Sequence, residues 1–431
     1  MKRHTLAASL CLAFLPMAYA ETTTSPYSLA DAITQGQSLS SFRLRYENVE
    51  QQGLSKDANA TTLRTLLGWQ TAPMNGLSVG LQVINVAKLQ DDYNDKASGV
   101  DQPGHASYPV VADPDFTAIN QLYLDWTSLP DTKLRLGRQS VKLDNVRFIG
   151  NVEFRQVMQV FDGASVTNKT FKDVELYSAW FTGNRNINTD FKHDHTGILH
   201  ASWRFSPTET LTGYGYFYDQ NNVAVASDLS SRTLGARADG ARPLSTEWKW
   251  LYTAEYAKQD AWAGSRDRSA AQGQIDAHYY RVGTGVGWQD WSVRVDQELL
   301  SSNNYKYAFQ TPLGTNHLFQ GWVDKFLVTP DAGIRDTFIT ASGKLGGFKL
   351  LTEYHWLDSD VRFDTTGTGT RNGTRYGTEW DVGVSYDFRK DLLGKIEYGN
   401  YTEKDPYFNS SGANKRYKDT QKLWITMLYS F

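Results

Sequence analysis

Charged side chains at every second position are the feature of this sequence that could do chemistry. Arg43 and Arg45 alternate with Phe42, Leu44 and Tyr46. An alternation with a period of two predicts a β-strand with one apolar and one polar face. A guanidinium offers a planar fork of donors that matches a carboxylate. A polar face of this kind could therefore bind an anionic ligand, provided that other strands hold it in place.

The same alternation recurs from residue 41 to the end of the chain. The last twelve residues, TQKLWITMLYSF, place Leu423, Ile425, Met427, Tyr429 and Phe431 on one face. About ten residues are what a tilted strand needs to cross a bilayer. A strand of a soluble β-sandwich would show the same pattern, so the connections between strands have to decide. Further strands are predicted near 63–70, 77–83, 122–126, 134–139, 162–170, 174–181, 196–206, 210–218, 232–240, 246–258, 275–288, 291–300, 334–344, 348–358, 376–388 and 393–401.

Short and long connections alternate strictly between these strands. The short ones are 72–76, 128–131, 171–173, 206–209, 241–245, 289–290, 345–347 and 389–392. The long ones are 50–60, 90–118, 141–161, 182–195, 219–231, 259–274, 301–333, 359–375 and 402–419. Short periplasmic turns and longer extracellular loops produce this alternation. The sequence therefore predicts an all-β fold, a transmembrane antiparallel β-barrel of about eighteen strands, in the outer membrane of a Gram-negative bacterium.

The first residues predict export from the cytoplasm. Lys2 and Arg3 precede an apolar stretch, and Ala18-Tyr19-Ala20 resembles a signal-peptidase site. We expect a cleaved signal peptide at 1–20, a short and mildly helical periplasmic lead-in at 21–40, and the barrel at 41–431. Cleavage would remove Cys11, the only cysteine, and would exclude disulfides and thiol chemistry.

The polar face of the strands should line the lumen, which eighteen strands leave too wide for side chains to fill. Eleven basic and twelve acidic residues fall on this face, a mixed lining. One interpretation is that cross-strand ion pairs simply stiffen a wet wall. The other is that arginines gather on one wall and carboxylates on another, at a constriction. The predicted pore-lining or substrate-contacting residues are Arg43, Arg45, Glu47, Arg64, Asp125, Arg135, Arg147, Arg155, Arg204 and Arg294.

Two of the long connections are too apolar for free surface loops. Residues 137–163 read GRQSVKLDNVRFIGNVEFRQVMQVFDG, and residues 311–328 read TPLGTNHLFQGWVDKFLV. Both segments should pack somewhere. Inward folding would place Arg147, Glu153 and Arg155 in the lumen, whereas outward folding would cap the barrel mouth.

These two segments also resemble the alginate export family of outer-membrane proteins, as do SLADAITQGQ, FRLRYENVEQ and YPVVADPDFTAINQLYLDW. The resemblance covers nearly all of the chain after residue 20. It implies an eighteen-stranded barrel that passes solutes across the outer membrane, and in some members a polyuronate leaves through an arginine-rich pore. By this resemblance, Arg43, Arg45, Arg64, Arg135, Arg147 and Arg155 would contact carboxylates. The mixed lining departs from such a pore and favours a porin-like member.

Enzyme, metal and nucleic-acid functions find little support. No G-x-S-x-G motif occurs, His193-Asp194-His195 lacks a third metal ligand nearby, and the aspartates at 91, 92 and 95 lack EF-hand spacing. The near balance of 44 basic and 47 acidic residues argues against nucleic acid. We expect no catalytic residue, no metal and no cofactor.

The predicted function is passive diffusion of small polar or anionic solutes through a porin-like channel. Export of an anionic polysaccharide such as alginate is an alternative, and a plugged barrel acting as an adhesin or structural protein is another. The expected partners are these solutes, outer-membrane lipid including lipopolysaccharide, and the barrel-assembly machinery, which would recognise the last strand ending at Phe431. A monomer is expected.

Overall fold

The computed structural model describes residues 28–221, 228–263, 275–409, 412–413 and 417–431. The predicted signal peptide lies outside the described residues. The lead-in contains a short helix, α1 (Leu29–Thr34), as its sequence predicted. Ser28 and Asp31 form a capping box at its start, in which each side chain bonds the other residue's backbone N–H. No helix among the described residues combines the length and the apolar character that crossing a membrane requires.

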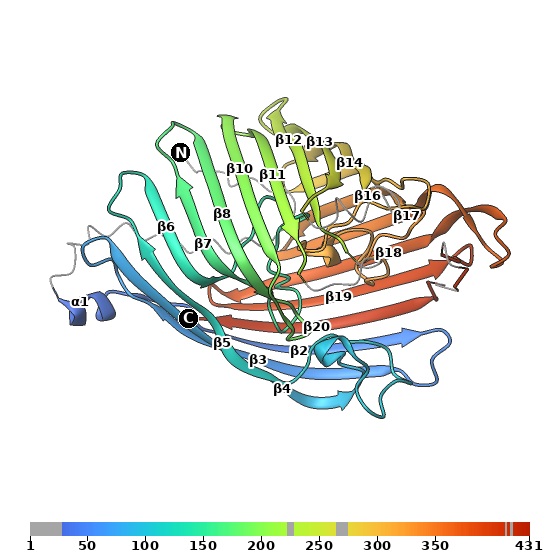
Figure 1. Cartoon of the computed structure of the whole chain (residues 1–431), viewed down its shortest axis with the longest axis horizontal. Coiled ribbons are helices and arrows are strands. Elements are labelled where there is room, and N and C mark those ends of the chain that lie inside the picture. The colour runs from blue at the N-terminus through green and yellow to red at the C-terminus, as the bar shows by residue number, and fades with distance from the viewer. Residues whose placement is uncertain (1–27, 222–227, 264–274, 410–411, 414–416) are drawn as a thin grey trace.

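Eighteen long antiparallel strands form a closed barrel (Figure 1). The first nine are β2 (Ser41–Gln51), β3 (Ala58–Gln70), β4 (Leu77–Asp92), β5 (Phe116–Trp126), β6 (Thr132–Gln139), β7 (Val160–Asn168), β8 (Val174–Arg185), β10 (His195–Ser206) and β11 (Glu209–Asp219). The others are β12 (Ser231–Pro243), β13 (Trp248–Ala261), β14 (Asp276–Trp288), β15 (Trp291–Leu300), β16 (Ile334–Leu345), β17 (Phe348–Asp364), β18 (Arg371–Arg389), β19 (Leu392–Glu403) and β20 (Thr420–Ser430). The two-residue strands β1 (Gln37–Ser38) and β9 (Phe191–Lys192) pair with β3 and β8. Pairing of β2 with β20 closes the barrel, so the predicted strand count is confirmed.

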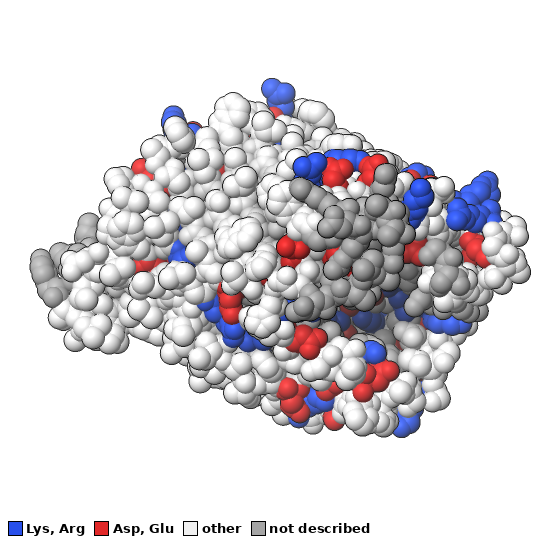
Figure 2. Space-filling view, viewed as in Figure 1, with Lys and Arg blue, Asp and Glu red and all other residues white. Residues whose placement is uncertain are grey.

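The two faces of each strand differ in the predicted way. On β15, Val293 and Val295 are 49% and 47% exposed, whereas Asp296, on the opposite face of the strand, is only 1% exposed. On β20, Ile425 and Met427 are exposed and Trp424 is fully buried. Figure 2 shows few charged side chains over the visible wall near α1, and many toward the end where the long loops lie. The exposed apolar residues therefore form the lipid-facing surface, and the opposite residues point into the barrel.

Strands β17 and β18 extend further than the sequence predicted. The predicted strands stop at 358 and start at 376, whereas β17 continues to Asp364 and β18 begins at Arg371. The outward side chains of this extension are charged rather than apolar, so the hydropathy alternation ends before the strand does. These two strands form a hairpin that projects at the end with the long loops (Figure 1).

Lipid-facing positions should tolerate a charge according to their depth. We expect Val295→Arg to lower the free energy of unfolding by about 2–4 kcal/mol, because it places a cation near the middle of the apolar band. Leu345→Arg, at the short-turn end of β16, should cost only about 0–1 kcal/mol. Equilibrium unfolding of protein refolded in lipid vesicles measures both, and equal costs would contradict the membrane placement.

Candidate functional site

Two long loops fold into the barrel and pack on each other. They are the 140–159 loop, between β6 and β7, and the 301–333 loop, between β15 and β16. Gly150 N donates to Leu313 O at 2.9 Å, and Thr315 N donates to Val146 O at 2.9 Å. Their apolar residues join inward-facing tyrosines and phenylalanines of the strands in one buried cluster. The apolar character of both segments is thereby explained by inward folding, one of the two arrangements that the sequence allowed.

The 140–159 loop rests on two arginines of β2. Arg43 donates from Nε to Gln156 Oε1 at 2.8 Å and from Nη1 to Glu153 O at 2.7 Å, and Nη2 donates to Arg155 O. Arg45 Nη1 donates to Phe154 O, and its guanidinium lies 4.2 Å from the centre of the Phe154 ring. Three successive backbone carbonyls of the loop thus accept hydrogen bonds from these two guanidinium groups.

Arg64 is the unsatisfied member of this wall. It lies directly opposite Arg43, its Cα partner across the β2–β3 pair, and is only 1% exposed. Its Nε and Nη1 atoms are buried without a hydrogen-bond partner in the described structure. Like charges directly opposite on a sheet destabilise it, and a buried donor without an acceptor costs free energy. This position breaks two local rules, which is typical of functional sites.

The 301–333 loop rests on a wall of opposite charge. Strands β15 to β19 contribute six inward carboxylates, two of them from β18: Glu298, Asp336, Glu353, Glu379, Asp381 and Glu397. Val323 N donates to Glu379 at 2.6 Å, and the indole Nε1 of Trp322 donates to Glu353 at 3.0 Å. Gly321 has a φ of +86°, and an added Cβ would meet the Glu379 carboxylate. The tight approach of this turn to the acidic wall therefore depends on glycine.

An ion-pair network joins both loops to the wall where the barrel closes. Arg155 of the 140–159 loop binds Glu47 of β2 at 2.9 Å and Asp324 of the 301–333 loop at 2.8 Å. Lys422 of β20 binds the same Asp324 at 3.0 Å. His317 Nδ1 donates a hydrogen bond to the ionised Asp324 carboxylate at 2.8 Å. Burial alone would raise the pKa of Asp324, but the neighbouring Lys422, His317 and Arg155 hold it well below its usual value.

The remaining predicted residues lie away from this network. Arg135 and Asp125 form a bidentate pair, with N–O distances of 2.6 and 2.7 Å. Arg294 binds its strand neighbour Asp296 at 3.0 Å. Arg147 reaches Glu298 at 2.9 Å and so anchors the loop to the acidic wall. Arg204 is exposed near the short-turn end of β10. The structure thus brings together Arg43, Arg45, Glu47, Arg64 and Arg155, and distributes the other predicted residues elsewhere.

Comparison with known families places this barrel. The family model for alginate export matches residues 36–299. The chain belongs to the alginate export family. No curated protein sequence matches it.

Solved structures with the same fold come from Pseudomonas aeruginosa. OccK9 (OpdG) is 12% identical with a TM-score of 0.67, and OpdK crystallised with vanillate is 12% identical with a TM-score of 0.66. Each comparison covers 92% of this chain and 98% of the other. OccK3 (OpdO) is 14% identical with a TM-score of 0.64, covering 94% and 97%. At these identities the likeness shows the fold, a porin-like barrel of the Gram-negative outer membrane.

Sequence patterns did not identify several residues that contact the arginines and carboxylates of this loop network. Asp113, Gln156, His317 and Asp324 lie in loops, where no periodicity marks a side chain as inward. Lys422 lies on the polar face of the last strand, so the sequence predicted that it points inward. The sequence did not predict its partner, Asp324. Only the spatial path of the two loops reveals these contacts.

The Arg155–Asp324 pair should hold the loops in place. Arg155→Met removes the cation that Glu47 and Asp324 share and leaves Lys422 beside two buried carboxylates, so we expect up to about 3–5 kcal/mol less protection against local opening. Hydrogen exchange at the Gly150 and Thr315 amides measures it. Lys142→Met is the control, because Lys142 forms an exposed pair with Glu153 worth at most about 1 kcal/mol. Equal effects of the two substitutions would contradict the proposed role of the pair.

Glu153 should make loop docking sensitive to acid. The Glu153 side chain is 38% exposed. The desolvation that it does undergo opposes its charge, but Lys142, Arg64 and Arg43 outweigh this effect and lower its pKa to about 2. A carboxylate with a depressed pKa stabilises the fold above its unfolded pKa and loses this effect as the pH falls through the folded value. We expect the melting-temperature difference between wild type and Glu153→Gln to be constant above about pH 4.5 and to shrink toward pH 2. A difference that does not change with pH would refute this.

Proposed function

We propose that this protein is an outer-membrane channel for passive diffusion of small polar or anionic solutes, with the two inward loops as its constriction. The observation that carries the proposal is Arg64, a buried guanidinium that faces Arg43 and has two donor atoms without acceptors. A solute carboxylate would accept charge-assisted hydrogen bonds from these donors. Arg64 would therefore act as the anion contact of the constriction.

The charges on either side of the loops support this proposal. Arg43, Arg45 and Arg64 lie on β2 and β3, and the carboxylates of Glu353, Glu379 and others lie on β15 to β19. Charges of opposite sign on neighbouring sectors of the wall, separated by β20, orient a dipolar or anionic solute, and a low-dielectric surrounding strengthens this field. A small solute that passes the constriction would be guided along the arginine wall.

We also propose that the protein is a monomer and has no enzymatic activity. We also infer that the assembly machinery recognises the last strand, in which Phe431 stacks with Phe42 and Tyr429 at centroid distances of 5.7 and 5.5 Å. The pore-contacting roles of Arg43, Arg45, Arg64 and Arg155 belong to this proposal, as does the signal peptide at 1–20.

Export of an anionic polysaccharide is the second candidate, because the family model is that of alginate export. The 140–159 and 301–333 loops pack on each other inside the barrel, so we infer that export of a polymer would require these loops to move. A plugged barrel is the third candidate, because the 140–159 and 301–333 loops occupy the lumen.

Ion selectivity tests the constriction. For protein lacking residues 1–20, refolded in a planar bilayer with a salt gradient, we expect a steady conductance with anion preference. Arg64→Gln should lower the chloride-to-potassium permeability ratio, because it removes a buried cation at the constriction. Arg204→Gln removes the same charge from an exposed site, where water screens it, and should change the ratio little.

Each other outcome separates the candidates. Cation preference or none would refute the basic constriction and leave a general channel, and absence of conductance would favour the plugged barrel. The swelling rate of vesicles that contain the protein measures how fast a given solute enters, and so identifies the class of solute. Glucuronate should enter at least as fast as glucose, and Arg64→Gln should slow glucuronate alone. Entry of uronate oligomers at a comparable rate would favour the polysaccharide exporter.

A further inference from the structure

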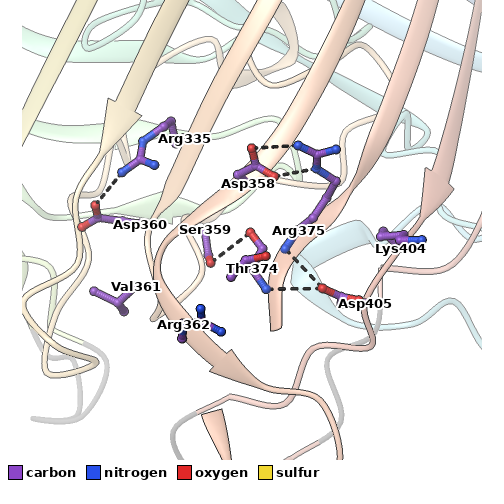
Figure 3. A pocket seen from close by; sticks show the side chains of 10 residues that line it. All are labelled: Arg335, Asp358, Ser359, Asp360, Val361, Arg362, Thr374, Arg375, Lys404 and Asp405. Carbon is purple, nitrogen blue, oxygen red and sulfur yellow. Dashed lines mark hydrogen bonds and ion pairs between the residues drawn. The ribbon is translucent and has the colours of Figure 1, made fainter. Parts of the chain in front are cut away.

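A pocket opens where β17 separates from β18 near the end with the long loops. Asp358 pairs with Arg375 and Phe363 pairs with Gly373, so four residues of β17 oppose a single residue of β18 between these two pairs. This bulge leaves a cavity of about 470 Å³ (Figure 3). Four neighbouring elements contribute to its lining, which is rich in charged side chains: β16, β17, β18 and the segment that follows β19.

The pocket lies on the outside of the barrel, just beyond the lipid-facing aromatic residues. Tyr354 and its Cα partner Trp380 are 38% and 49% exposed on the lipid side, while His355 and Leu357 point inward. Asp358, Asp360 and Arg362 continue the outward row of Tyr354. Asp358 lies four residues further on, which is about 13 Å along the strand. Aromatic residues mark the edge of the hydrocarbon layer, so the pocket lies at the level of the lipid headgroups.

The neighbouring strands repeat this arrangement. On β16, Arg335 continues the outward row of Ile339, which is 38% exposed. After β19, Lys404 continues the outward row of Ile396, which is 54% exposed. The cations of the pocket are therefore continuous with the lipid-facing surface and do not face the lumen.

The pocket has more cations than its own carboxylates neutralise. Arg375 pairs with Asp358 at 2.6 Å and Arg335 pairs with Asp360 at 3.5 Å (Figure 3). The carboxylate of Asp405 accepts from the backbone N–H groups of Thr374 and Arg375 at 3.3 Å.

In the part of the chain that the structure describes, two cations of the pocket have no carboxylate partner. Arg362 donates to the backbone carbonyl of Asn372 at 3.4 Å. The ammonium group of Lys404 has no acceptor among the described residues, and Figure 3 shows where both side chains lie. A guanidinium and an ammonium with free donors at one cavity form a site for a phosphate group.

We propose that this pocket binds a phosphate of the glycolipid that forms the outer leaflet, with Arg362 and Lys404 as its ligands. Asp358 and Asp360 hold the other two arginines, which leaves Arg362 and Lys404 as the cations available to a ligand. The position at headgroup level favours a lipid over a dissolved anion, because the acyl chains would lie on the apolar surface below. The proposal is independent of the transported solute.

Binding of lipid A tests the proposal. The folded protein lacking residues 1–20, in detergent, should bind diphosphorylated lipid A in native mass spectrometry. Dephosphorylated lipid A should bind at least tenfold more weakly. The double variant Arg362→Gln/Lys404→Gln should lose at least tenfold in affinity for the diphosphorylated form, because charge-assisted hydrogen bonds are among the strongest. Lys344→Gln/Arg389→Gln removes two cations at the opposite end of β16 and β18, and should bind like wild type.

Three outcomes would overturn the proposal: equal binding of both lipids, an equal loss in both double variants, or displacement of the lipid by millimolar inorganic phosphate, which would indicate a free-anion site. Heat-dependent mobility in gel electrophoresis verifies folding, and Arg362→Gln alone replaces the double variant if that variant does not fold. The conductance of the double variant should equal that of wild type, which separates this result from the proposed channel function.

Discussion

A charge inside a wide barrel needs a partner, and the Arg155–Asp324 pair meets this need for both loops at once. Each member of the pair also contacts the barrel wall, Arg155 through Glu47 of β2 and Asp324 through Lys422 of β20. These are the strands that close the barrel. The two loops are therefore anchored where β2 meets β20. Each buried charge of this network is balanced by a residue from another part of the chain. Removing any one would leave the others in a poorly solvated environment.

The two loops use opposite ends of the peptide group. Carbonyls of the 140–159 loop face arginines, whereas amides of the 301–333 loop face carboxylates. Backbone groups can satisfy hydrogen bonds without cancelling the charge of the side chains they contact. Arg43 and Arg45 consequently keep their charge while their donors are largely satisfied. On the other wall, Glu298, Asp336 and Glu397 are paired with Arg147, His355 and Lys395. Arg135 and Asp125, by contrast, neutralise each other and correspond to the simple stiffening pairs that a mixed lining also predicts.

The fold was predictable because period-two alternation and loop lengths are local properties of the sequence. Strand number, closure, and the lipid-facing residues of β15 and β20 followed from them. The ends of β17 and β18 did not, because charged outward residues above the membrane hide the alternation. The site was half predictable: the inward direction of Arg43, Arg45 and Arg64 was visible, whereas Asp324 and Gln156 depend on the path of two loops through three-dimensional space. No pattern along the chain encodes that path.

Unmatched donors, rather than charge alone, distinguish the two proposed sites. Arg43 has three loop acceptors and Arg375 has a carboxylate, so their donors are committed to the fold. Arg64, opposite Arg43, and Lys404, which lines the same pocket as Arg375, have donors without acceptors among the described residues. A buried guanidinium without acceptors costs stability, and the barrel offsets this cost elsewhere through the loop anchors. The partner that supplies the missing acceptors gains most where the protein has already oriented the donor, because little conformational freedom remains to be lost on binding.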